Sequence, residues 1–418
     1  MNEILSFWAQ WLRPSAGLPT VQWSLLLAVA AMTGYLLQRH IGLPKVVGYS
    51  LVGAVAGLAG FSGAVWPLQG IGLFMLELGI SIVLFECGGR IPLRWFRHNP
   101  MVLVQSVAES ALTYFAVYWV LLWLDMPARV AGPLALVALA ASPAVLTRVV
   151  ADTRAAGPVT ERAIVLATLS TLYALTLGSA RAELMNRSSI TFMDTVYPVM
   201  VVLGVSIIVA AVLALVLRMA LRFMSPTSES TSMLLLALVA AATAVAAHMG
   251  GSAPLAALLG GMLLKQLNPR PWAWPRQLGN ASSLLTMLMF VLVSTVAAQA
   301  DWSGPVAGVV LALIVVRLVA KALGVAVGNA GSGSSWLQAL WVSCAMTPMS
   351  AIALLIASQF VLASPSTGHL IARVALPAIL LMEVLGAVIA TVAIYRAGES
   401  SKPWAPLARG NQGDSRES

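Results

Sequence analysis

Long apolar stretches alternate with short polar segments along most of the chain, from near residue 20 to residue 395. Each apolar stretch holds about 20 residues, the length at which a helix crosses the hydrocarbon core of a bilayer. The pattern therefore predicts an all-α polytopic membrane protein. We place thirteen spans at roughly 22–38, 43–60, 70–88, 101–124, 130–151, 162–180, 195–217, 231–247, 252–267, 279–298, 305–327, 336–361 and 370–395.

The two ends of the chain do not have the pattern of a span. Residues 1–21 carry Trp8 and Trp11 together with Arg13 and Pro14, so we expect an interfacial segment rather than a cleavable signal peptide. Residues 396–418 are polar and contain several prolines and glycines, which predicts a disordered cytoplasmic tail. The transmembrane domain is expected at 22–395.

Composition excludes a water-soluble globule. Hydrophobic residues make up 59% of the chain and charged residues only 9%, whereas soluble domains carry about 25% charged residues. The formal net charge of +9 fits a membrane protein that gathers Lys and Arg on its cytoplasmic face, and it does not indicate a nucleic-acid partner. The expected partner is the lipid bilayer of a plasma membrane, which in a bacterium is the inner membrane.

The basic residues test the span count, because alternate loops lie on the same side of the membrane. With thirteen spans, seventeen Lys and Arg fall on one side, and only Arg13, Arg129, Arg181, Arg187 and Arg373 fall on the other. Cytoplasmic loops carry the excess of basic residues. The sequence therefore predicts an N-terminus outside and a C-terminus in the cytoplasm.

The chain also has the pattern of a duplication. The glycine-rich stretch KVVGYSLVGAVAG (45–57) has a counterpart in GSAPLAALLGGMLLK (251–265), and the proline-interrupted LAASPAVLT (139–147) has one in SCAMTPMSAIA (343–353). Six spans lie on each side of the span 195–217, so the two halves have opposite orientations in the membrane. This predicts an inverted repeat, the device of many secondary transporters, with repeats at about 43–217 and 231–395.

Ser142-Pro143 and Thr347-Pro348 stand in the middle of matching spans of the two halves. Proline removes a backbone donor and clashes with the preceding helical turn. Broken helices at membrane depth are tolerated where protein or a water-filled cavity satisfies the freed backbone groups. We expect two broken helices that cross near the midplane, and the alternative is that each proline only kinks its helix.

Arg317 and Lys321 lie inside a span and, four residues apart, share one helix face. A charge within a span indicates a functional site. Lys321 is close enough to the inner end of its span to reach the interface, so Arg317 is expected to be the deeper of the two. The alternative is a structural pair that locks neighbouring helices together.

Four acidic residues also fall within spans. Glu86 precedes Arg90 by four residues, which predicts a local ion pair near the inner face. Glu77, Glu109 and Glu383 lie deeper. Each of these three is either a protonated carboxyl that is hydrogen-bonded between helices or a proton carrier, and the residues leave both interpretations open.

The motifs of enzymes and pumps are absent from the sequence. It contains no Walker-type loop, nucleophile elbow or HExxH pattern. The histidines and the two cysteines form no metal-binding spacing. We therefore expect neither an enzyme nor a resident metal or cofactor.

Taken together, six stretches make the chain resemble the cation/proton antiporter superfamily over roughly residues 20–395. They are LPKVVGYSLVGAVAGL (43–58), LELGISIVLFECGGRI (76–91), ALAASPAVLTRVV (138–150), TERAIVLATLSTLYAL (160–175), SAPLAALLGGMLL (252–264) and MTPMSAIAL (346–354). The resemblance implies the sodium/proton exchanger fold, a homodimer and an elevator-like movement. It also implies exchange of a monovalent cation (sodium or potassium) for protons, at a site on the span 162–180 beside the crossing.

The sequence departs from the family at that site. The family has an acidic residue in a pair that falls here on Thr171 and Leu172, while its basic residue falls on Lys321 or on Arg317. Near the centre of the span, Ser170, Thr171, Tyr173 and Thr176 offer hydroxyl oxygens, which can coordinate a cation but cannot exchange a proton near neutral pH. The site is then expected to be electropositive, unless Glu77, Glu109 or Glu383 supplies a carboxylate.

Three hypotheses follow. The first is an antiporter of monovalent cations and protons with an atypical site. The second is a carrier of an anionic or organic solute on the same fold. The third is a non-transporting membrane sensor or scaffold.

Overall fold

The computed structural model describes residues 18–402 except for positions 62–65, 67, 69, 92, 94, 95, 97, 98, 186–191, 226, 227, 269–275 and 301. Every regular element within these residues is a helix. They are α2 (Leu18–His40), α3 (Lys45–Leu58), α4 (Gly70–Gly89), α6 (Pro100–Trp123), α7 (Ala128–Leu139), α8 (Pro143–Thr153), α9 (Pro158–Glu183), α10 (Phe192–Phe223), α11 (Glu229–His248), α12 (Ala253–Leu267), α13 (Arg276–Ala298), α14 (Gly304–Val327), α15 (Trp336–Ala345), α16 (Ala351–Ala363) and α17 (Pro365–Arg396).

The helices fall at the positions of the predicted spans. Nine spans of the described residues, with α7 and α8 counted together, are long and apolar enough to cross a membrane. Shorter apolar helices, among them α3, α12 and α16, take other predicted positions. The expectation of an all-α polytopic membrane protein is confirmed. The predicted interfacial segment 1–21 lies mostly outside the described residues.

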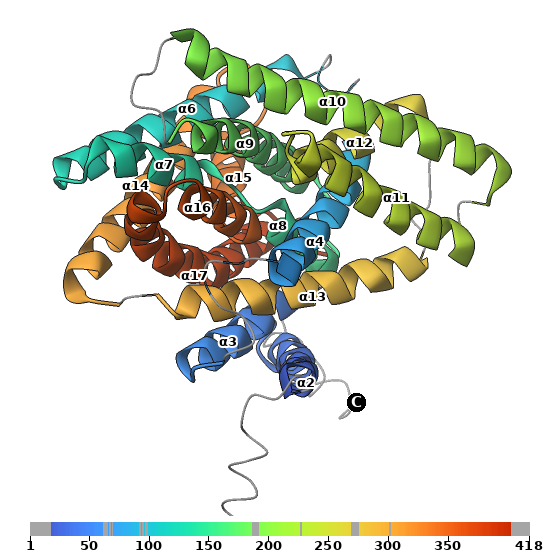
Figure 1. Ribbon diagram of the computed structural model, residues 1–418, viewed down its shortest axis with the longest axis horizontal. Coiled ribbons are helices and arrows are strands. Elements are labelled where there is room, and N and C mark those ends of the chain that lie inside the picture. Colours follow the sequence, from blue (N-terminus) through green and yellow to red (C-terminus); the bar gives the residue numbers. More distant parts are fainter. Residues whose placement is uncertain are drawn as a thin grey trace, which may run out of the picture.

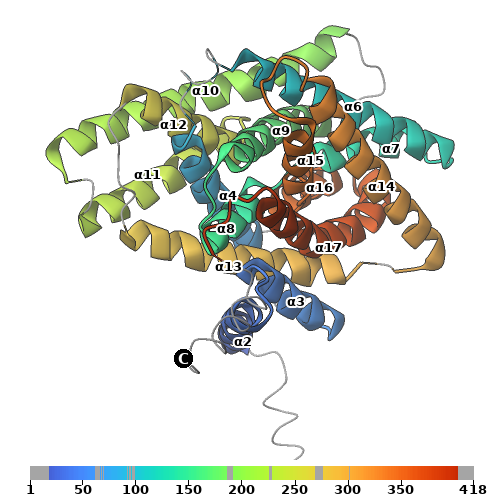
Figure 2. The same ribbon diagram turned by 180° about the vertical axis from the view of Figure 1, so that it is seen from behind.

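The helices form two groups, which α10 joins (Figures 1 and 2). In the scaffold group, α3 packs against α13 and α2, and α12 packs against α4 and α11. In the crossing group, α6 packs against α14 and α7, and α17 packs against α15 and α16. Helix α9 contacts α7, α8, α15 and α16 of the crossing group, and α10 contacts α9, α11 and α12.

The packing is symmetrical between the two halves of the chain. Helix α3 packs on α13 as α12 packs on α4, and α2 packs on α3 as α11 packs on α12. Helices α6 and α14, which hold corresponding places in the halves, pack on each other. The inverted repeat is therefore confirmed in the arrangement of the helices, while the limits 43–217 and 231–395 stay a prediction.

Glycines bring the scaffold helices into backbone contact. A Cβ atom at Gly53 or Gly57 of α3 would overlap the carbonyl oxygens of Val291 or Thr295 in α13. In the symmetrical place, a Cβ atom at Gly261 of α12 would overlap the carbonyl oxygen of Phe85 in α4. Such close approach by small residues is how helices associate in lipid, where apolar burial gives little driving force. The two glycine-rich stretches that mark the duplication thus make corresponding contacts, each with a helix of the other half.

Both predicted helix breaks are present. Helix α7 ends at Leu139 and α8 begins at Pro143, and α15 ends at Ala345 while α16 begins at Ala351. Pro143 occupies the first position of α8, where its missing N–H costs nothing, and the Ser142 hydroxyl caps this helix by accepting from the Val145 amide (3.4 Å). The proline therefore starts a new helix instead of kinking a continuous one.

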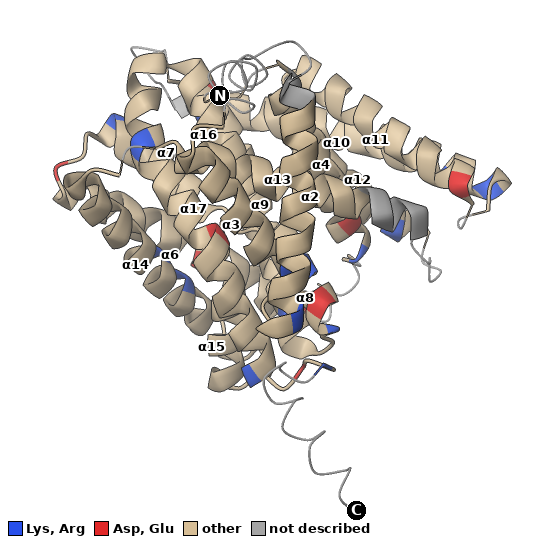
Figure 3. Ribbon diagram, turned by 90° about the horizontal axis from the view of Figure 1, so that it is seen from below, with Lys and Arg blue, Asp and Glu red and all other residues tan. Residues whose placement is uncertain are grey.

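Charged residues are sparse along the helices and gather at their ends and connections (Figure 3). Near the inner face as the sequence predicts it, Arg90 and Glu86 form the expected ion pair (2.5 Å). Burying unpaired charge in lipid is costly. The charges that do lie inside the bundle therefore require a specific partner.

The first residues of the polar tail dock onto the bundle. The Glu399 carboxylate accepts hydrogen bonds from the amides of Val159 and Thr160 (both 2.7 Å), and the Ser400 hydroxyl donates to the Thr153 carbonyl (3.1 Å). The expectation of disorder from residue 396 onward is wrong for the described part, 397–402, because the first amides of α9 need acceptors and Glu399 supplies them. Residues 403–418 lie outside the described residues.

Replacing Gly261 with alanine is expected to destabilise the protein by about 1–3 kcal/mol, because the added methyl group forces α12 away from the Phe85 carbonyl. Thermal unfolding of the purified protein in detergent measures this. Gly308→Ala on α14 is the matched control, since nothing lies within 4 Å of the place that a Cβ atom would take there. Equal melting temperatures for the two variants would contradict the close-packing argument.

Candidate ion site

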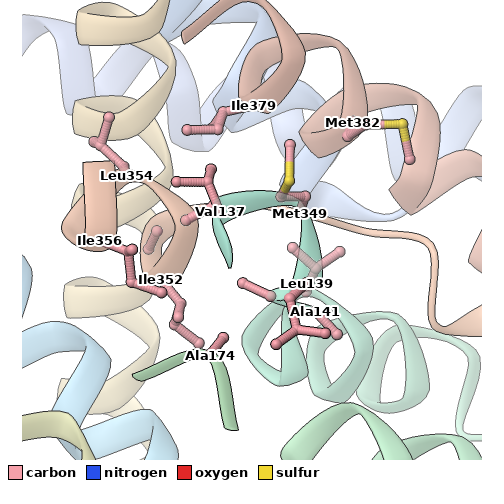
Figure 4. Close-up of a cluster of buried hydrophobic side chains, with 14 of the residues drawn as sticks. Val137, Leu139, Ala141, Ala174, Met349, Ile352, Leu354, Ile356, Ile379 and Met382 are labelled. Carbon is pink, nitrogen blue, oxygen red and sulfur yellow. The ribbon is translucent and has the colours of Figure 1, made fainter. Parts of the chain in front are cut away.

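The two helix breaks, residues 140–142 and 346–350, lie at the centre of the crossing group. Many of the side chains around them are apolar and buried. Figure 4 shows Val137, Leu139 and Ala141 of the first broken helix facing Met349 and Ile352 of the second. Because water is excluded here, the free backbone groups of both breaks must find partners within the protein.

Arg317 of α14 supplies those partners. Its Nε donates to the Ala138 carbonyl (2.7 Å), one terminal nitrogen to the Ala140 carbonyl (2.9 Å), and the other to the Thr347 carbonyl (2.6 Å). The side chain is 0% exposed. A planar guanidinium can reach three acceptors at once, and its positive charge lies at the C-terminal ends of α7 and α15, where the helix dipoles are negative. Arg317 therefore holds the two broken helices together.

Lys321 lies one turn further along α14 and forms a buried ion pair with Glu109 of α6. Both side chains are 0% exposed. The ammonium also lies 3.4 Å from both the Leu139 carbonyl and the Ser170 hydroxyl. The expectation that Lys321 reaches the interface is wrong, because a buried carboxylate holds its ammonium beside the first break.

Hydroxyl groups complete the surroundings of Glu109. Ser110 and Ser170 both donate to its Oε2, at 3.1 and 3.3 Å. Ser170 also lies 3.1 Å from the Leu139 carbonyl. The carboxylate of Glu109, the ammonium of Lys321 and the hydroxyl of Ser170 thus meet at the end of α7.

The charges in this cluster balance. The negative charge of Glu109 offsets the positive charge of Lys321. The carbonyl groups at two helix C-termini offset much of the positive charge of Arg317. Of the alternatives that the sequence left open, the structure has the one in which a carboxylate from another helix, Glu109 of α6, lies beside the basic residue.

The other hydroxyls of α9 lie at different places. Thr171 donates to the carbonyls of Ala141 (3.2 Å) and Ala167 (2.8 Å), so it lies directly beside the first break. Tyr173 accepts from Ser106, and Thr176 bonds to its own helix. Tyr173 and Thr176 line a cavity of about 650 Å³ between α6, α7, α9 and α10, whose walls are mostly apolar.

The two remaining candidate carboxylates do not join Glu109. Glu383 of α17 is fully buried and accepts a hydrogen bond from Ser50 of α3 (2.9 Å). Glu77 on α4 is half-buried and has no hydrogen bond within the described part of the chain. The structure brings together Ser170, Arg317, Lys321 and Glu109, with Thr171 beside them.

Sequence reasoning missed Ser110 and the carbonyl groups of residues 138–140. Backbone carbonyls carry no sequence signal, because every residue has one. Glu109 was among the sequence candidates, and the structure shows what brings it close: a Cβ atom at Gly324, one turn from Lys321, would overlap the backbone of Glu109, so the glycine lets α6 approach α14. Among the described residues, no group of three His, Cys, Asp or Glu side chains could hold a metal ion.

The fold and the cluster define a class of protein: a multi-pass secondary transporter whose inverted halves each contribute a broken helix to a central crossing. The chain matches the sodium/hydrogen exchanger transmembrane family over residues 27–396, and it belongs to that family.

Solved structures agree in fold. The structure of the sodium proton antiporter MjNhaP1 from Methanocaldococcus jannaschii at pH 8 has a TM-score of 0.69 and 15% identity, covering 91% of this chain and 98% of that chain. A second structure of the same antiporter, from an electron-microscopy map, has a TM-score of 0.67 and 17% identity, covering 93% and 100%. Comparison with curated proteins gives no match.

Replacing Arg317 with methionine is expected to lower the free energy of unfolding by about 3 kcal/mol or more, because three buried carbonyls lose a charged donor. Arg317→Lys is expected to recover only part of this, since an ammonium cannot span both breaks. Thermal unfolding in detergent measures both. The exposed Arg90→Ala is the control and is expected to change stability by less than about 1 kcal/mol. Full stability of Arg317→Met would show that the guanidinium does not hold the crossing.

Proposed function

We propose that the protein is an antiporter of monovalent cations and protons that works by alternating access at the crossing. The observation that carries this proposal is the buried Glu109–Lys321 pair beside Ser170. It places a carboxylate next to the span on which the family resemblance puts the ion site. Membership of the sodium/hydrogen exchanger family supports a monovalent cation and protons as the transported ions, and in this proposal the cation is sodium or potassium.

In this proposal the Glu109–Lys321 pair exchanges a cation for a proton. A cation that reaches Glu109 finds the carboxylate together with the hydroxyl oxygens of Ser110 and Ser170, the oxygen ligands that hard cations prefer. As the cation takes the carboxylate, the Lys321 ammonium loses its counter-ion and gives up a proton to water. The neutral amine keeps its lone pair, and no covalent bond other than N–H changes. One cation is bound and one proton is released, so the total charge of the site is unchanged.

The return step reverses this reaction on the other side of the membrane. Protonation of the Lys321 amine restores the ammonium, which reclaims Glu109 and displaces the cation. The inverted halves give the crossing group two equivalent arrangements against the scaffold group, as alternating access requires. In this proposal the protein is a homodimer in the plasma membrane, with its N-terminus outside and its C-terminus in the cytoplasm.

One observation favours a second candidate function. The cavity of about 650 Å³ that reaches Tyr173 and Thr176 is far larger than a dehydrated cation, is mostly apolar, and has Arg181 on its wall. Apolar walls with a single positive group suit an amphipathic organic anion. A carrier of such a solute is the alternative, and a non-transporting sensor would move neither solute.

Replacing Glu109 with glutamine is expected to reduce cation-evoked proton release by roughly tenfold or more, because the amide cannot hold the ammonium or the cation by charge. Proteoliposomes with a pH-sensitive dye inside, given sodium or potassium outside, measure this. Glu86→Gln is the control, since that carboxylate forms a partly exposed pair with Arg90 away from the crossing, and it is expected to transport like the wild type.

Undiminished exchange by Glu109→Gln would contradict the role of this carboxylate. If the wild type releases no protons with either cation, the antiporter proposal fails. Accumulation of a labelled amphipathic anion that is lost in Arg181→Ala would then support the second candidate.

A further inference from the structure

A second buried polar centre lies around Glu383, away from the Glu109–Lys321 pair. Its carboxyl meets three hydroxyls from different elements: Ser50 of α3, Ser294 of α13 and Ser350 just before α16. All four residues are buried: Ser350 is 1% exposed and the other three are 0% exposed. Two of the helices belong to the scaffold group, and Glu383 and Ser350 belong to the crossing group. The centre therefore spans the boundary between the two groups.

Three oxygen atoms of this centre have unused bonding capacity. Ser50 donates to Oε1 of Glu383 at 2.9 Å. Oε2 of Glu383 and the hydroxyls of Ser294 and Ser350 have no hydrogen-bond partner within the described residues, although both hydroxyls are near enough to act on the carboxyl. Buried polar atoms in native structures are almost always paired, so three unpaired oxygens at one place need an explanation.

The charge of the Glu383 carboxyl limits what could bond to the three unpaired oxygens. Glu109 is balanced by Lys321, but among the described residues no charged side chain acts on Glu383. An ionised carboxylate at this depth is costly unless a positive group accompanies it. A proton on Oε2 would neutralise the carboxyl and could hydrogen-bond to one serine. A monovalent cation would neutralise the same charge and would, in addition, coordinate the carboxylate and both hydroxyl oxygens at one point.

The ligand set also limits which cation fits. All four groups offer oxygen, which hard cations prefer. The total charge of the ligands is −1, so a monovalent cation gives a neutral centre, whereas a divalent ion would leave a buried positive charge. Magnesium, moreover, keeps several of its waters and demands octahedral geometry.

We propose that Glu383, Ser50, Ser294 and Ser350 form a second binding site for a monovalent cation, sodium or potassium. This goes beyond the proposed exchange at Glu109 and does not depend on it. Because the ligands come from both helix groups, the site is complete only in arrangements that keep α17 and α16 against α3 and α13. Cation binding here therefore stabilises the arrangement that the structure shows.

Thermal unfolding of the purified protein in sodium chloride, potassium chloride and choline chloride of equal ionic strength tests the proposal. The wild type is expected to melt at a higher temperature in sodium or potassium than in choline. Glu383→Gln is expected to reduce this difference and to leave only the part that cation binding at Glu109 contributes. The double variant Ser294→Ala/Ser350→Ala, which keeps the carboxyl, is expected to need at least about tenfold more cation for the same shift.

Glu77→Gln is the matched control, because Glu77 lies in the membrane on α4 but outside this centre, and it is expected to keep the wild-type difference. Glu109→Gln separates the two proposals, since it is expected to lose proton release yet keep the cation-dependent shift. The same melting temperature in all three salts for the wild type would overturn the proposal, as would a full shift in Glu383→Gln. If Glu383→Gln does not fold, the double variant Ser294→Ala/Ser350→Ala is used instead. If it needs the same cation concentration as the wild type for the same shift in melting temperature, the site is overturned, and if it needs more, the site is supported.

Discussion

The three hydrogen bonds of Arg317 are the interaction on which the rest of this structure depends. Each broken helix ends inside the bundle, where carbonyl groups have no water to bond with. One guanidinium meets carbonyls at both breaks, at 2.6–2.9 Å, and so fixes the two broken helices to α14 and to each other. Without a donor of this shape the breaks would be too costly to keep, and the crossing beside α9 would not form.

The position of Arg317 also explains why Lys321 has a different partner. The Arg317 guanidinium bonds to carbonyl groups at helix ends, so it does not compete with Lys321 for a carboxylate. Lys321, one turn away, is left with Glu109 as its buried partner. Two cations on one helix face therefore have different partners: Arg317 bonds to backbone carbonyl groups, and Lys321 pairs with a carboxylate.

The symmetry of the fold places a second polar centre opposite the first. Helix α17 holds the place in the second half that α9 holds in the first, and each contacts the scaffold group. On α9 the hydroxyls of Ser170 and Thr171 lie at the crossing and the carboxylate comes from α6, whereas on α17 the carboxylate of Glu383 is on the helix itself and hydroxyls come from its neighbours. The two halves thus keep one architecture while distributing their acidic and hydroxyl groups differently.

Much of the fold could be predicted from the sequence because bilayer thickness, helix length and proline chemistry act locally. Apolar runs of about 20 residues gave the spans, Pro143 and Pro348 gave the breaks, and the glycine-rich stretches at 45–57 and 251–265 gave the repeat. The ion pair of Glu86 with Arg90 was readable because its members are four residues apart. The docking of Glu399 on the start of α9 was not, because its partners lie about 240 residues away in sequence.

Some features of the candidate site could likewise be predicted from the sequence, and others could not. By itself the sequence determined that the centre of α9 carries no acidic residue and that Arg317, Lys321, Glu109 and Glu383 lie within spans, because each position is set by its place along an apolar run. Only the tertiary structure decided which charge meets which. Arg317 bonds to backbone carbonyls, Lys321 pairs with Glu109, and Glu383 accepts from Ser50, and these pairings join residues that are 30 to more than 300 positions apart. Helix packing brings such residues together, and no local pattern records it.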